Sequence, residues 1–177
     1  MSDALVLIDV QKAFYDKSWG GKYNLQAEKN IKHLLDYFRI KNKSIIHIKH
    51  ISNNPNSLFH KDREQDFIFE TRNNEIVIEK YVNSAFIGTN LNEILQENNI
   101  EHITIAGISL PHCVSTTVRM AQNLGFSVDL IEDATISFDL KDSQGNILNA
   151  KDVHKYNIAA LNNEFANVYT TEKYIKN

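Results

Sequence analysis

The chain has 177 residues, of which 42% are hydrophobic and 23% charged, a composition typical of one globular domain with a full core. Its net charge of −3, with the signs interspersed, shows no basic surface of the kind that binds nucleic acid or an anionic membrane. One cysteine excludes an intrachain disulfide, the first residues lack signal-peptide features, and no apolar stretch is long enough to cross a bilayer. We therefore expect a single cytosolic domain, residues 1–177, whose partner is a small molecule or another copy of itself.

Apolar residues predict alternating strands and helices along the chain. Residues 4–9 form a continuous apolar run that ends in Asp9, which predicts a strand buried on both faces. Residues 31–38 carry apolar side chains at the spacing of one helix face. Further strands are predicted at 44–50, 75–79, 102–107 and 127–133 and near 168, and further helices at 91–95, 114–124 and 150–162. The predicted fold is α/β, with three α-β-α layers around a mostly parallel, doubly wound central sheet of about six strands.

Polar residues at the carboxyl ends of these strands are the candidate site residues, because open parallel sheets bind ligands there. Asp9 ends the first strand, Lys80 follows the third, and Cys113 lies just beyond the fourth, where a helix begins. The first amides of a helix stabilise a thiolate or an oxyanion. If the strands are near neighbours, the three side chains meet and suffice for nucleophilic acyl transfer. The alternatives are an inert buried cysteine, an aspartate that caps a turn and a solvated lysine.

Three groups of residues carry a resemblance to a known family. They are Leu7-Ile-Asp-Val-Gln11 with Phe14; Lys80 with Ser84-Ala-Phe86 and Gly88-Thr-Asn-Leu91; and Ala106-Gly107, Cys113-Val114, Thr117, Ala121, Gly125 and Asp133-Ala134. In these motifs the chain resembles the isochorismatase-like cysteine hydrolase superfamily, which includes nicotinamidases and N-carbamoylsarcosine amidases. The resemblance runs along nearly the whole chain, and it implies one hydrolase domain.

The resemblance implies a role for each candidate residue. Cys113 would attack a carbonyl carbon and form a thioester, while Asp9 would take the thiol proton, pass it to the leaving amine and activate water. Lys80 would hold Asp9 in place and help to keep Cys113 ionised. The family builds its oxyanion hole from backbone amides, here those of Ser109 and Cys113. It commonly has a non-proline cis peptide at the position of Ile108–Ser109.

The chain departs from the family beside the nucleophile. Many members have a threonine three positions before the cysteine, where this chain has Leu110, and Pro111 and His112 replace commoner small or apolar residues. The backbone donors are retained, but the pocket wall is altered. His112 is interpreted as a second base, a substrate contact or simply a packed side chain.

The histidines argue against a metal. Nicotinamidases place Asp-x-His at the end of the second strand to bind a divalent ion, and the corresponding residues here are His50 and Ser52. His47 lies three positions before His50 on a strand, so the two point to opposite faces. His60 and Asp62 in the following loop remain as alternative ligands. We predict no catalytic metal and no other cofactor, and we disfavour a nicotinamidase.

The cysteine also separates branches of the family. The isochorismatases that cleave a vinyl ether work without a nucleophilic cysteine, so Cys113 indicates a C–N bond in an amide, carbamoyl or lactam-like small molecule. Two alternatives remain: isochorismatase-type ether hydrolysis, and a non-catalytic binding protein of the same fold.

The expected substrate pocket is aromatic, which favours a flat or apolar small molecule. Its candidate residues are Phe14, Trp19, His50, Phe59, Phe86, His112 and Phe138. In relatives a neighbouring subunit often completes the loops after the second strand, so we expect a homo-oligomer, a dimer or a tetramer. A solution mass equal to one chain would contradict this expectation.

Overall fold

A computed structural model describes residues 2–176 of the chain. Within these residues seven strands form one sheet in the order β2-β6-β5-β1-β3-β4, with β9 also beside β6. All neighbours are parallel except β2, which runs antiparallel to the end of β6. The strands of this sheet are β1 (Ser2–Ile8), β2 (Lys22–Tyr23), β3 (Ser44–His50), β4 (Ile76–Lys80), β5 (Ile100–Ile108), β6 (Ser127–Phe138) and β9 (Asn167–Tyr169).

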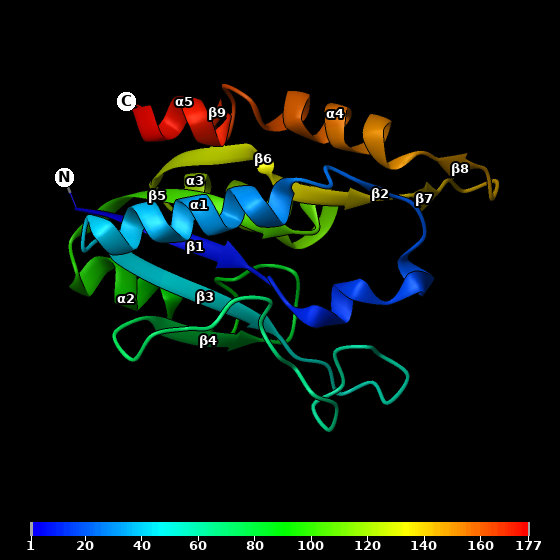
Figure 1. Cartoon of the computed structure of the whole chain (residues 1–177), viewed down its shortest axis with the longest axis horizontal. Helices are drawn as coiled ribbons and strands as arrows, with labels where there is room; N and C mark the ends of the chain where they lie inside the picture. The colour runs from blue at the N-terminus through cyan, green and yellow to red at the C-terminus, as the bar shows by residue number, and fades with distance from the viewer. Residues whose placement is uncertain (1, 177) are drawn as a thin grey trace.

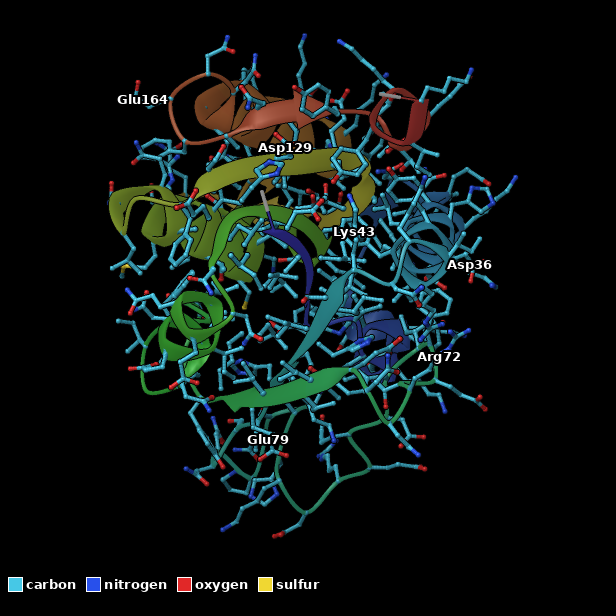
Figure 2. The ribbon with its side chains drawn as sticks, turned by 90° about the vertical axis from the view of Figure 1, so that its left-hand side faces the viewer. Asp36, Lys43, Arg72, Glu79, Asp129 and Glu164 are labelled. Carbon is cyan, nitrogen blue, oxygen red and sulfur yellow. The ribbon has the colours of Figure 1, made fainter. Side chains whose placement is uncertain are left out.

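Helices cover both faces of the sheet. In Figure 2, which looks along the strands, α2, α3 and α4 lie on one side, and α1 and α5 lie on the other. A short hairpin and three short helical turns complete the described chain. The bounds are α1 (Ala27–Ile40), α2 (Leu91–Glu97), α3 (Ser115–Asn123), α4 (Ala150–Leu161), α5 (Thr171–Lys176), β7 (Leu140–Lys141), β8 (Ile147–Leu148), η1 (Lys12–Tyr15), η2 (Lys17–Trp19) and η3 (Leu110–Val114).

The central strand β1 is buried on both faces, and this explains its continuous apolar run. Leu5 and Leu7 pack into the core beneath α1, whereas Val6 and Ile8 pack into the core beneath α2 and α3. Because successive side chains of a strand point to opposite faces, one short segment anchors both helical layers.

The predicted architecture is confirmed, and the differences concern short elements. The sheet has seven strands within residues 2–176 rather than about six, because the two residues of β2 join its edge. Helix α5 was not predicted, since six residues are too few to display a helical period. The helix predicted at 114–124 is confirmed as α3 (Ser115–Asn123), and the π-helical turn η3, which was not predicted, directly precedes it.

The carboxyl ends of the strands form the edge that holds the longest connection. The arrowheads of β1, β3 and β4 point toward the end of the molecule where the loop of residues 51–75 extends (Figure 1). The outermost strand, β4, carries the exposed Glu79 on its outer side (Figure 2), a charge that discourages pairing with another strand. No helix within residues 2–176 has the length and apolar character to cross a membrane.

Candidate active site

Strand register brings the first two candidate residues together. Asp9 directly follows β1, and its amide still donates to the carbonyl of Ile48 in β3 at 3.0 Å. Lys80 ends β4 and is the register partner of His50 in β3. Because β1, β3 and β4 are adjacent and parallel, their last side chains meet at one edge of the sheet, as the sequence predicts.

Cys113, the third candidate residue, is positioned by the close approach of β5 to β1. Gly107 pairs with Ile8, and a Cβ at Gly107 would lie 2.1 Å from the Ile8 carbonyl oxygen. Only glycine fits there, also because its φ is +138°. The following peptide bond, Ile108–Ser109, is cis, as the family resemblance implies. The chain then enters η3, which carries Cys113.

Lys80 is completely buried, and its ammonium has three hydrogen-bond acceptors. Its Nζ donates to Asp9 Oδ2 at 2.7 Å, to His50 Nδ1 at 3.1 Å and to the carbonyl of Val82 at 3.1 Å. An ammonium has three N–H bonds, so these contacts use all of them. Lys80 is therefore a fixed positive charge beside Asp9.

The second carboxylate oxygen of Asp9, Oδ1, accepts no hydrogen bond. Among residues 2–176, Asp9 Oδ1 is the one buried side-chain nitrogen or oxygen that lacks a hydrogen-bond partner. A carboxylate oxygen of Asp9, the thiol of Cys113 and a ring nitrogen of His50 all lie within 4.8 Å of one another. Burial raises the pKa of Asp9 above its ordinary value, and the charge of Lys80 opposes this rise. Asp9 is therefore a candidate general base.

Cys113 is a thiol in the substrate-free site rather than a thiolate. Burial raises its pKa to about 12, the negative charge of Asp9 adds to the rise, and Lys80 opposes it. Lys80 thus favours the ionised form of Cys113, as the resemblance implies, but burial and Asp9 outweigh it in the resting site. A carboxylate oxygen of Asp9 lies within 4.8 Å of the thiol and is a candidate acceptor for its proton.

Backbone amides surround the nucleophile as the helix begins. The amides of His112 and Val114 both donate to the Ser109 carbonyl, whereas the Cys113 amide between them does not. It stands next to the reactive sulfur, as an oxyanion donor would. His112 is exposed, and its Nδ1 lies 3.0 Å from Ser109 Oγ.

The predicted separation of the two histidines of β3 is confirmed. His47 is buried against Glu75, with 2.8 Å between Nε2 and Oε2, whereas His50 contacts Lys80. Asp9, His50 and Cys113 form the one cluster of three metal-ligand side chains within residues 2–176. The Lys80 ammonium already donates to Asp9 Oδ2 and lies against His50 Nδ1, so its positive charge sits beside this cluster and would repel a divalent cation there. The donor set does not fit a metal in this state.

Four of the predicted aromatic residues form one cluster, which we call the aromatic cluster: Phe14, Trp19, Phe59 and Phe138. The ring of Phe14 lies 4.9 Å from Trp19, 5.1 Å from Phe59 and 5.7 Å from Phe138, measured between centroids. The cluster reaches the candidate site through Phe59, whose ring centroid lies 5.1 Å from that of His50. Phe86 lies elsewhere, stacked on Phe126 in the core beneath α2 and α3.

Two buried glutamines position the site, and sequence reasoning assigned them no role. Gln11 is fully buried; its Oε1 accepts from the His50 amide at 2.7 Å and its Nε2 donates to the His50 carbonyl at 3.1 Å. The same Nε2 contacts Gln65, which in turn donates to the carbonyls of Leu58 and His60. The available signal was a polar residue two positions after Asp9, just beyond a buried strand.

A cavity of about 680 Å³ lies away from these residues. Its walls include His102 near the start of β5 and Ser127 at the start of β6, so it opens at the amino edge of the sheet. Neither Asp9 nor Cys113 lines it. The reactive groups, not the cavity volume, therefore locate the candidate site.

Comparisons with known proteins agree with the fold and the motifs. The sequence model of the isochorismatase domain matches residues 3–173. The uncharacterised isochorismatase family protein YrdC of Bacillus subtilis is 46% identical over 175 residues, which cover 97% of this chain and 94% of the relative.

Solved structures give the same result. A protein of the isochorismatase family from Chromobacterium violaceum is 39% identical with a TM-score of 0.95, and the match covers 99% of this chain and 92% of that one. An isochorismatase from Pseudomonas putida is 32% identical with a TM-score of 0.83, covering 97% and 89%. The chain therefore belongs to the isochorismatase family of hydrolases.

Proposed function

We propose that the protein hydrolyses a C–N bond of a small amide, carbamoyl or lactam-like molecule, with Cys113 as nucleophile. The observation that carries the proposal is the buried, unpartnered Asp9 Oδ1 close to the thiol. A buried acceptor without a donor is unfavourable, and a proton from the cysteine would satisfy it. An inert structural cysteine needs no such neighbour.

In the proposed reaction Asp9 accepts and returns a proton twice, once in acylation and once in hydrolysis of the thioester. Asp9 takes the thiol proton as the sulfur attacks the carbonyl carbon, and the amides of Ser109 and Cys113 stabilise the oxyanion. Asp9 then gives its proton to the departing nitrogen, which leaves a thioester on Cys113. It next takes a proton from water as the water attacks the thioester, and returns a proton to the sulfur as the acid departs. Lys80 positions Asp9 and takes no part in the proton transfers, since all three of its N–H bonds have acceptors.

The test is a screen of small primary amides, carbamoyl compounds and lactams for hydrolysis, with Cys113→Ala and Cys113→Ser as paired variants. We expect both to lose activity by at least about 10³-fold, because the covalent route is removed. Intact mass of the wild-type protein during turnover should show the acyl adduct. Retention of activity in Cys113→Ala would contradict the proposal and favour ether hydrolysis without a cysteine.

The matched control for the base is Asp9→Asn, which retains the size of the side chain. We expect it to prevent acylation, while alkylation of Cys113 by iodoacetamide persists because that reagent needs no proton on a leaving group. If Asp9→Asn forms the acyl adduct at the wild-type rate, Asp9 is not the base.

A further inference from the structure

The contact between Lys80 and His50 determines which ring nitrogen of His50 carries the proton. Lys80 Nζ lies 3.1 Å from His50 Nδ1, and an ammonium can only donate a hydrogen bond. Nδ1 must therefore be the acceptor and carry no proton. The neutral ring then holds its proton on Nε2, which makes Nε2 a hydrogen-bond donor.

That donor is at least partly accessible to solvent. Nε2 makes no hydrogen bond within residues 2–176. If it were also fully buried, it would be an unsatisfied buried atom, but Asp9 Oδ1 is the one such side-chain atom in these residues. Nε2 is consequently reached by solvent. A donor that solvent reaches, on a ring that also touches the catalytic groups, is available to a substrate.

The ring is held rigidly, as a specificity element requires. Gln11 bonds both the amide and the carbonyl of His50, and Phe59 meets the imidazole edge-to-face at 82°. Lys80 fixes the inner nitrogen. Burial and the positive charge of Lys80 lower the pKa of His50 to about 4, so the ring is neutral at physiological pH.

We propose that His50 determines substrate specificity: its Nε2–H donates to an uncharged acceptor on a planar substrate that lies against the aromatic cluster. This inference rests on the proposed function and narrows it to flat amides that carry a second acceptor, such as a ring nitrogen or a further carbonyl. A carboxylate is disfavoured, since a neutral donor provides no full positive charge and Lys80 has no N–H left to offer.

Two substitutions distinguish the roles of the two ring nitrogens of His50. In His50→Asn the amide oxygen can take the place of Nδ1 and accept from Lys80, but nothing replaces Nε2. In His50→Gln the longer amide can place a donor near Nε2, but the acceptor for Lys80 is lost. The inference predicts that His50→Asn loses specificity and that His50→Gln retains most of it.

Aromatic aldehydes serve as probes that need no known substrate. The sulfur of Cys113 adds to the aldehyde carbon, the C=O double bond becomes a C–O single bond, and the thiol proton ends on that oxygen as a thiohemiacetal. Benzaldehyde and the 2-, 3- and 4-isomers of pyridine carbaldehyde differ only in one ring acceptor. Their dissociation constants can be measured from protection of Cys113 against iodoacetamide.

The measured quantity is the ratio of the affinity for a pyridine isomer to the affinity for benzaldehyde. For at least one isomer we expect this ratio to be about fivefold higher in the wild type than in His50→Asn, which is the effect of one neutral hydrogen bond. An equal ratio in both proteins for all three isomers would overturn the inference. So would nitrogen NMR of histidine-labelled protein that finds the proton on Nδ1, with the His50 signal identified by its loss in His50→Asn. If no aldehyde reacts with Cys113, the proposed nucleophile fails instead, and the NMR result still decides the tautomer.

Discussion

Lys80 Nζ lies 2.7 Å from Asp9 Oδ2, and neither side chain is more than 1% exposed. Two opposite charges have therefore been taken out of water together, at the ends of β4 and β1. Such a pair stabilises the fold little by itself, but each charge is costly without the other. Its position beside Cys113 fits the proposed catalytic use better than a purely structural one.

Lys80→Met should destabilise the protein by about 3–5 kcal/mol, because it leaves the carboxylate of Asp9 buried without a counter-charge. The double variant Asp9→Asn with Lys80→Met should recover part of this loss, since both charges are gone. Urea denaturation followed by circular dichroism measures both free energies of unfolding. Equal stability of the single and double variants would show that the pair is not electrostatically coupled.

Alkylation of Cys113 should be slow at neutral pH and rise about tenfold per pH unit without a plateau up to about pH 10, because burial raises its pKa to about 12. Asp9→Asn should move the profile to lower pH, since it removes a negative charge that raises the pKa. Asp36→Asn on the exposed face of α1 is the control and should change nothing. A plateau near the ordinary value of about 8.5 would contradict the burial argument.

Gly107→Ala should unfold the protein or cost at least about 3 kcal/mol, because the new methyl group would lie 2.1 Å from the Ile8 carbonyl oxygen. Gly88→Ala is the matched control. Gly88 also has a positive φ, of 69°, but a Cβ there meets nothing within 4 Å, so we expect a cost of only about 1 kcal/mol. Thermal melts of the two variants compare the effects directly, and similar losses would mean that backbone conformation, not the close approach, decides.

His102 should make stability depend on pH. Its hydrogen bond to Asp129, 3.0 Å long, and the charge of that carboxylate raise the pKa of His102; Asp129 lies near the amino end of β6 (Figure 2). A raised pKa in the folded state stabilises the protein fully below the unfolded value of about 6.5, and this is lost as the pH rises through the folded pKa.

His102→Gln should therefore cost about 1 kcal/mol at about pH 5.5 and much less at about pH 9. His33→Gln, on the exposed face of α1, is the control. Urea midpoints at the two pH values measure the difference. A cost for His102→Gln that is the same at both would refute the linkage.

The location of the site was largely predictable, because it depends on strand ends. Asp9 and Cys113 follow buried apolar strands and Lys80 ends the edge strand β4, and parallel strands place such residues at one edge. The contacts of Gln11 and the tautomer of His50 were not predictable. Each depends on a partner at least thirty positions away along the chain, which no local pattern reveals.

The sequence by itself determined the layered α/β fold, the family motifs and the residue types at the carboxyl edge, because apolar periodicity and the order of elements along the chain can be read locally. Only the tertiary structure decided the protonation of the site. A neutral buried thiol and an ionised thiolate are the same letter in the sequence, and the pKa of Cys113 depends on what surrounds it. The three acceptors around Lys80 and the free oxygen of Asp9 likewise exist only once β1, β3 and β4 have assembled.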